Sequence, residues 1–309
     1  MQKMNQSNQN KRNAVIGISA AFVLLFVLIR LAPVEPCEVL HYGDYMNEEG
    51  AVEYCGEEET AFFDMTEIRY PIEVKLQPQG EVVPGEAMTF DLYLHDHLGR
   101  GIAYEDIVVS HTERIHLMSV DPSLTDYQHL HPKPAGAPGH FQFELTPTKT
   151  GDYNVYLDFI SLLSQRRVLA SAGFNVKGEG NAANIEKNTA TVSDGYVFEL
   201  QTPGEGSFPA GEESLLELKV RPSEDGAVID FGLVMGAYAH LVVFDEKGSG
   251  FAHLHPQNPF IDKQDPGNPD LRFSFFPGDP GKYRLWAQLM IDGEERFVPF
   301  DLEVVGDAS

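Results

Sequence analysis

The sequence predicts an all-β protein with two tandem immunoglobulin-like β-sandwich domains after an N-terminal transmembrane helix. Three observations lead to this fold class. Short stretches of alternating apolar and polar residues are separated by turns that use many of the 28 Gly and 20 Pro residues, a pattern typical of antiparallel strands. A unit of about 100 residues, the size of an immunoglobulin-like domain, occurs twice. A basic N-terminus precedes a long apolar run.

The N-terminus has the charged and then apolar pattern of an export signal. Four basic residues and no acidic residue precede Val34, and the run 14–29 is apolar apart from Ser19 and small residues. No small-x-small pair follows this run, which favours an uncleaved signal anchor over a cleaved signal peptide. The positive-inside rule then places the N-terminus in the cytoplasm. We therefore expect a single-pass protein of the cell membrane, with its C-terminal domains in the periplasm or outside the cell.

We expect six segments along the chain. They are a cytoplasmic basic tail (1–13), a transmembrane signal anchor (14–34), a Cys-bridged acidic segment (35–70), a first β-sandwich (71–177), a linker (178–194) and a second β-sandwich (195–309). The linker begins where the sequence becomes polar and rich in Gly and Asn, a composition typical of a flexible connection.

The charge of the chain excludes one large class of function. The 309 residues carry a formal charge of −25, and the 18 basic and 47 acidic residues that follow the N-terminal region give that part a charge of −29. Such an acidic surface repels phosphate backbones, so we expect no nucleic-acid partner. The nucleophile and phosphate-loop motifs of common enzyme families are absent from the sequence.

The two cysteines, Cys37 and Cys55, both follow the predicted anchor. An even pair in an oxidising compartment is most simply a disulfide. Such a bond would hold together an acidic segment that is too small to build a core of its own. The alternative is a redox or metal site formed by Cys37, His41 and Cys55.

The repeat is visible as matching strand and turn sequences. VKLQP at 74–78 corresponds to FELQTP at 198–203, and GDYNVY at 151–156 corresponds to GKYRLW at 281–286. Each repeat therefore predicts the same series of short strands.

Three histidines stand in the same register in both repeats. They are His116, His129 and His131 in the first repeat, and His240, His253 and His255 in the second. The intervals are 13 and then 2 residues in both, and each His-x-His pair is followed by Pro. The repeats differ at most other positions, so chance is a poor explanation for this agreement.

A strand places residues i and i+2 on the same face, so two imidazoles of a His-x-His pair can bind one ion. A third histidine from a neighbouring strand would give three neutral nitrogens and an open position, which suits zinc or copper(II). Met118 shares a strand face with His116, and a thioether there would favour copper(I). The second repeat has Val242 at that position.

Two other interpretations of the histidines stay open. They could be core residues that close a loop, with Pro132 and Pro256 ending the strands, or they could serve catalysis. A further His-x-His pair at 95–97 precedes Gly99 and Gly101, and we interpret it as part of a hairpin turn.

The motifs His-Leu-x-x-Val, His-Leu-His-Pro and Gly-x-Tyr resemble a class of secreted bacterial immunoglobulin-like domains. These are similar to the YtkA-like group and to periplasmic domains associated with copper and heavy-metal handling. The resemblance covers residues 73–177 and 196–305 and leaves out the cysteine segment. It implies a sandwich fold, an exported location and metal handling by the six histidines.

The leading hypothesis is therefore a membrane-anchored, extracytoplasmic protein with one three-histidine copper or zinc site in each sandwich. It would buffer the metal or deliver it to a membrane-protein partner. The alternative is a scaffold subunit of a membrane complex in which the repeated histidines are structural. We expect no enzyme, because no general base stands in fixed register with the histidines.

Overall fold

The computed structural model describes residues 13, 16–27, 60–68, 72–202, 207–224, 227–258 and 260–306. The chain separates into two compact units, 1–40 and 41–309. Residues 16–27 are helical, and within the described part of the chain we find no helix that is both long and apolar enough to span a bilayer. The end of the predicted anchor and both cysteines, Cys37 and Cys55, lie outside the described residues.

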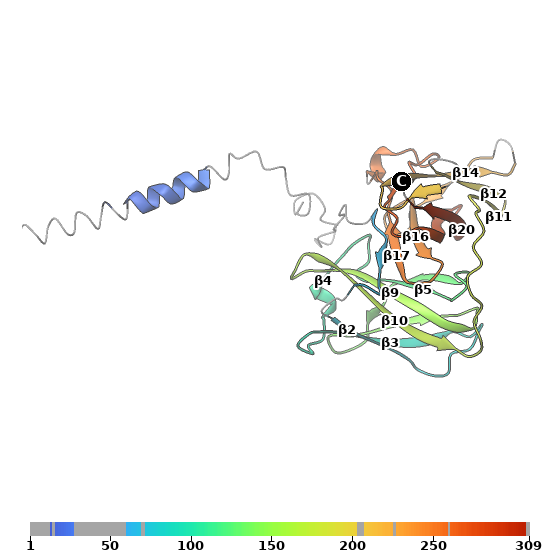
Figure 1. Cartoon of the computed structure of the whole chain (residues 1–309), viewed down its shortest axis with the longest axis horizontal. Helices are drawn as coiled ribbons and strands as arrows, with labels where there is room; N and C mark the ends of the chain where they lie inside the picture. The colour runs from blue at the N-terminus through green and yellow to red at the C-terminus, as the bar shows by residue number, and fades with distance from the viewer. Residues whose placement is uncertain are drawn as a thin grey trace, which may run out of the picture. The chain divides into compact units, whose positions relative to one another are not determined.

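The first repeat consists of two sheets that enclose one apolar core (Figure 1). The outer sheet has the order β2 (Ile72–Pro78), β3 (Met88–Asp96), β8 (His140–Leu145) and β7 (Lys133–Pro134). The inner sheet has the order β10 (Arg166–Val176), β9 (Gly151–Ser161), β5 (His116–Val120) and β6 (Tyr127–Leu130), with β4 (Ile107–Val108) also paired to β9. The short 3₁₀ helix η2 (Tyr104–Asp106) precedes β4.

The second repeat has the same two-layer arrangement. Its outer sheet has the order β11 (Ala190–Ser193), β12 (Tyr196–Gln201), β14 (Ser214–Pro222) and β18 (Arg272–Phe275). Its inner sheet has the order β1 (Phe63–Asp64), β17 (Gly250–Leu254), β16 (Ala239–Asp245), β19 (Gly281–Ile291), β20 (Glu294–Val305) and β13 (Ser207–Pro209), with β15 (Phe231–Gly232) on β19. The 3₁₀ helix η4 (Ile261–Lys263) lies between β17 and β18. The predicted mostly-β chain with two repeats is confirmed.

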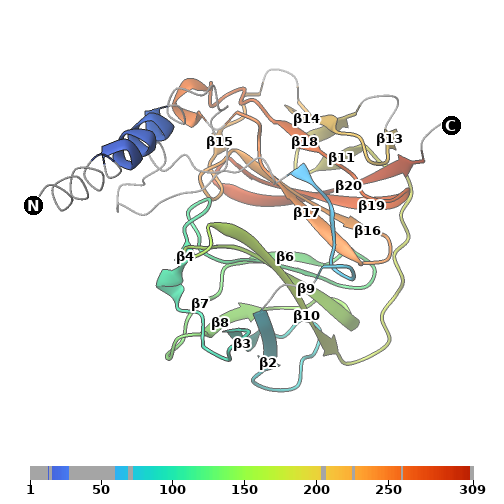
Figure 2. The ribbon, with the colours of Figure 1, turned by 60° about the vertical axis from the view of Figure 1, so that its left-hand side comes forward.

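The two inner sheets lie against each other, as the green and orange strands show (Figure 2), and a third apolar core lies between them. Strand residues alternate between two buried faces as a result. Leu117 of β5 belongs to the core of the first repeat and Met118 to the shared core. In β16, Leu241 belongs to the core of the second repeat and Val242 to the shared core. Both strands are therefore buried along their whole length.

Contacts between the inner sheets follow a quasi-two-fold symmetry. Tyr156 lies opposite Met118 in the first repeat, as Trp286 lies opposite Val242 in the second. The Tyr156 hydroxyl donates to the Gly248 carbonyl oxygen at 2.6 Å, and Trp286 Nε1 donates to the Leu124 carbonyl oxygen at 3.1 Å. Gly248 follows β16 as Leu124 follows β5. Each repeat thus contributes the equivalent surface to the contact, as the two subunits do in an isologous dimer interface.

Candidate metal centre

Seven of the 11 histidines of the chain form one cluster between the inner sheets. They are the six predicted residues, His116, His129, His131, His240, His253 and His255, together with His111. Every ring has another ring centroid within 5.2 Å. The side chains of His116, His129, His240 and His253 are buried.

Strand register explains how the sequence pattern becomes a cluster. Leu117 pairs with Leu130, and Leu241 pairs with Leu254. Antiparallel pairing therefore brings the next position of each hairpin into opposition, which sets His116 against His131 and His240 against His255. The second histidine of each His-x-His pair thus faces the histidine of the preceding strand.

His116, His129 and His131 form the first site. One ring nitrogen from each lies within 4.8 Å of the other two. His116 Nδ1 is 3.2 Å from His129 Nε2. Two nitrogens bound to one tetrahedral ion at about 2.0–2.1 Å stand about 3.3 Å apart. The observed separation therefore matches the spacing that two ligands of one ion would have.

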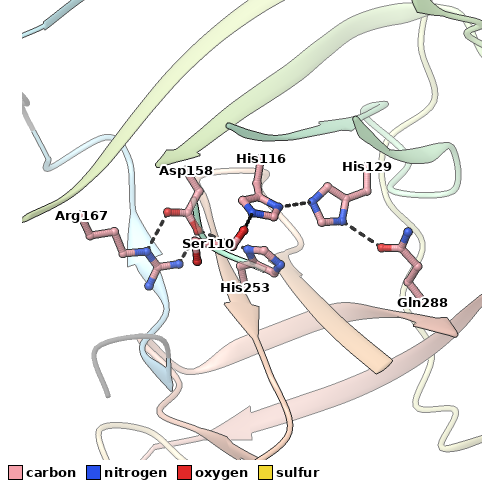
Figure 3. Close-up of polar contacts among 7 residues, drawn as sticks. All are labelled: Ser110, His116, His129, Asp158, Arg167, His253 and Gln288. Atoms are coloured by element: carbon pink, nitrogen blue, oxygen red, sulfur yellow. Dashed lines mark hydrogen bonds and ion pairs between the residues drawn. The ribbon is translucent and has the colours of Figure 1, made fainter. Parts of the chain in front are cut away.

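Neighbouring groups fix which nitrogen of each ring carries the proton (Figure 3). His116 Nε2 is 2.9 Å from the Ser110 carbonyl oxygen, which can only accept, so this nitrogen is protonated. His129 Nδ1 is 2.9 Å from Gln288 Oε1, whose amide is oriented by its Nε2 donating to Glu295. The neutral rings of His116 and His129 therefore turn lone pairs toward each other. Two facing lone pairs repel unless a cation or a proton lies between them.

His111, His240 and His255 form the second site, again with one ring nitrogen each within 4.8 Å of the others. The rings of His111 and His255 are stacked at 3.5 Å and 7°. From the sequence we expected His253 in this group and did not expect His111. The second site thus takes ligands from both repeats, whereas we expected each sandwich to hold its own.

His253 is held apart by a carboxylate of the other repeat (Figure 3). Its Nδ1 is 3.2 Å from Asp158 Oδ2, and Arg167 binds the same carboxylate through Nε at 2.8 Å and Nη2 at 2.6 Å. The carboxylate–histidine pair leaves His253 Nε2 as a lone pair, an arrangement common behind metal ligands. Its ring centroid is 5.2 Å from that of His116 and 4.5 Å from that of His255, so His253 lies between the two sites.

The supports behind the two sites are related by the quasi-two-fold symmetry. Asp158 lies opposite His116 on β9, and Gln288 lies opposite His240 on β19. Gln288 supports His129 of the first repeat, and Asp158 supports His253 of the second. Position 158 carries a charge and position 288 does not, so the two supports are alike in place but differ in charge.

His116, His129, His131 and His240 are neutral at physiological pH, which is the form that binds metal. Burial lowers the pKa of His116, His129 and His240 well below its usual value, and the neighbouring histidines lower it further. Burial also lowers the pKa of His131 to about 4. Burial alone would raise the pKa of Asp158, but the charge and hydrogen bonds of Arg167 hold it well below its usual range.

We expect the metal-free chain to lose stability as the pH falls from about 7 to 5.5. His116, His129 and His240 stay neutral in the folded chain over this range, while the same residues of the unfolded chain take up protons below about pH 6.5. Each of these three histidines then lowers the free energy of unfolding by about 1.4 kcal/mol per pH unit below that value. Urea denaturation with a chelator present measures the slope, and a flat profile over this range would contradict the prediction.

The other side chains that the sequence singled out lie in a turn or in a core. Asp96, in the middle of the other His-x-His pair, accepts hydrogen bonds from the backbone of Leu98 and Arg100, and closes a hairpin turn as expected. Met118 is fully buried in the shared core.

Sequence reasoning missed His111, Asp158 and Gln288. The turn that contains His111 has no histidine in the second repeat, and positions 158 and 288 gave no signal beyond strand alternation.

Comparison with solved structures gives only low overall similarity. A DUF4785 family protein from Legionella pneumophila is 11% identical with a TM-score of 0.27, covering 76% of this chain and 56% of that one. Salmonella alpha-2-macroglobulin reacted with methylamine is 12% identical with a TM-score of 0.26, covering 75% and 15%. E. coli alpha-2-macroglobulin in its native conformation is 10% identical with a TM-score of 0.26, covering 76% and 17%. The chain thus spans little more than half of the first of these proteins and under a fifth of the other two.

No curated protein matches the chain. A family model matches twice, at residues 69–177 and 190–306, and so covers both repeats and most of the sequence. The chain therefore belongs to the family described as Domain of unknown function (DUF8832).

Proposed function

We propose that this chain binds two transition-metal ions, copper or zinc, in the histidine cluster between two immunoglobulin-like sandwiches. Its role would be non-catalytic: to buffer the metal, or to deliver it to a membrane-protein partner, outside the cytoplasm and beside the membrane in which its N-terminal helix is anchored. The single observation that carries the proposal is the 3.2 Å approach of His116 Nδ1 and His129 Nε2. Both atoms present lone pairs, and a shared cation turns their repulsion into two bonds.

Buried nitrogens without hydrogen bonds support the same conclusion. Within the described part of the chain, His131 Nε2, both ring nitrogens of His240 and His253 Nε2 are buried and have no hydrogen-bond partner. A buried polar atom left in this state costs about 1–3 kcal/mol. A bound ion would satisfy several of them at once.

A stoichiometry measurement tests this proposal. The full-length chain, purified in a mild detergent and equilibrated with Zn²⁺ or Cu²⁺, should retain two equivalents of metal by mass spectrometry. His131→Leu and His240→Leu should each remove one equivalent, because each takes one nitrogen from one site. His140→Leu is the matched control, since His140 contacts Asp91 on the outer sheet, and it should retain both. Less than half an equivalent in the wild-type chain would overturn the proposal.

A second candidate is the structural or assembly role. The bonds from His129 to Gln288 and from His253 to Asp158 cross between the repeats, and they favour it. This role predicts that Gln288→Leu destabilises the chain equally with and without metal, and that a pull-down recovers stable membrane-protein partners. A metal role predicts instead that Zn²⁺ restores most of the lost stability.

A further inference from the structure

The turns that precede β5 and β16 have the same conformation. Backbone bridges join Ser110 to Glu113 and Val234 to Ala237. The second residue of each turn, His111 or Met235, has a left-handed backbone, with φ of 50° and 47°. Each stands five residues before the strand histidine, His116 or His240. His111 and Met235 are therefore equivalent, and both side chains are half-buried.

The turn of the first repeat reaches across to the second. The His111 ring lies 3.5 Å from that of His255 and 5.7 Å from that of His240. The two turns also touch each other, because a Cβ atom placed on Gly236 would lie 3.4 Å from Thr112 Cγ2. These residues are themselves equivalent, each following the left-handed residue of its turn. The quasi-two-fold axis therefore runs beside the two turns.

The same rotation relates the other contacts between the repeats, including Tyr156 with Gly248 and Trp286 with Leu124. The same rotation also relates the two turns. His111 lies beside His240 and His255, so the rotation places the equivalent residue, Met235, beside His116 and His131. We propose that the Met235 thioether is a fourth donor to the His116–His129–His131 site and makes that site selective for copper(I). This inference rests on the proposed metal binding and adds to it the identity of one ion.

The donor sets of the two sites then differ in softness. Three imidazoles with a thioether suit copper(I), whereas the all-histidine second site suits zinc or copper(II). Met118 is the other sulfur on this face of β5. It packs in the shared core with Val120 and Tyr156, and Val242 takes its place in the second repeat, so it provides a matched control.

Copper(I) binding tests this assignment. It is measured on the full-length chain in detergent, under anaerobic reducing conditions and against a competing copper(I) chelator. X-ray absorption should show a sulfur scatterer beside nitrogen in the wild-type chain. Met235→Leu should remove the sulfur and weaken one copper(I) equivalent by about tenfold or more, since loss of outer-shell partners alone weakens sites 10–100-fold. Zn²⁺ should still bind at two equivalents. Met118→Leu should leave copper(I) affinity and the sulfur signal unchanged.

Met235→His is a second variant, because His111 already adopts this backbone conformation. It should fold, hold Zn²⁺ at two equivalents and lose the sulfur signal. A wild-type spectrum with nitrogen donors alone, or a sulfur signal that disappears in Met118→Leu, would overturn the thioether assignment while leaving metal binding intact. A wild-type chain that binds neither copper(I) nor Zn²⁺ would overturn the proposed function and this inference together.

Discussion

Occupying both histidine sites is expected to raise the free energy of unfolding by about 4 kcal/mol per site when free Zn²⁺ exceeds the dissociation constant about 1,000-fold. The ligands of each site converge only in the folded chain, and those of the second site come from both repeats, so the ion stabilises the folded state over the unfolded one. Trp286 is the one tryptophan of the chain and bonds to Leu124 of the other repeat. Its fluorescence during urea denaturation therefore reports on this interface.

A variant that lacks one histidine of each site gives the control for this measurement. The double change His131→Leu and His240→Leu should remove most of the zinc-induced gain in the free energy of unfolding while leaving the metal-free value within a few kcal/mol of wild type. An unchanged gain in the double variant would place the stabilising ion elsewhere on this acidic chain and contradict the prediction.

Asp158→Leu is expected to lower the free energy of unfolding by about 3–5 kcal/mol. The change removes the carboxylate from a buried pair in which the Asp158 and Arg167 side chains are 9% and 8% exposed, and it removes the acceptor of His253 Nδ1–H. Removing the carboxylate of a buried ion pair is far more destabilising than removing a neutral hydrogen-bonding group.

Gln288→Leu is the matched control, because Gln288 occupies the equivalent position and accepts from His129 as a neutral amide. It should cost about 1–3 kcal/mol. Urea denaturation of both variants at pH 7.5 in a chelator measures the difference. Equal losses in the two variants would show that the charge at position 158 is not what holds His253.

The first site could be predicted because its geometry is local. His116 and His131 lie in one hairpin, and an interval that fixes strand register also fixes which side chains face each other. The strand alternation is likewise a local pattern, and the repeat is visible when the sequence is compared with itself. The six histidines and the mostly-β fold were therefore accessible from the sequence.

The second site could not be predicted because it depends on how the repeats pack. His111 meets His255 across an interface, 144 positions away in the sequence, and a comparison of the repeats points to His253 instead. The carboxylate that holds His253 lies on the other repeat and looks like an ordinary polar position in β9. One feature of the sequence did indicate that the inner sheet of the second repeat is covered on both faces. AHLVVF at 239–244 is apolar on both strand faces apart from His240, which is typical of such a strand.

The pairing of residues from both repeats in one cluster also determines when the centre can form during biosynthesis. A chain emerging from its N-terminus makes His111 and His116 more than a hundred residues before His240 and His255. Contacts between such distant positions form late, since a long loop must close first. The first repeat can bury its own core before the second is complete, but its inner sheet stays uncovered until then. Under the proposed function, metal capture at the second site would therefore be confined to chains that have finished folding, and a half-made chain would hold at most the first site.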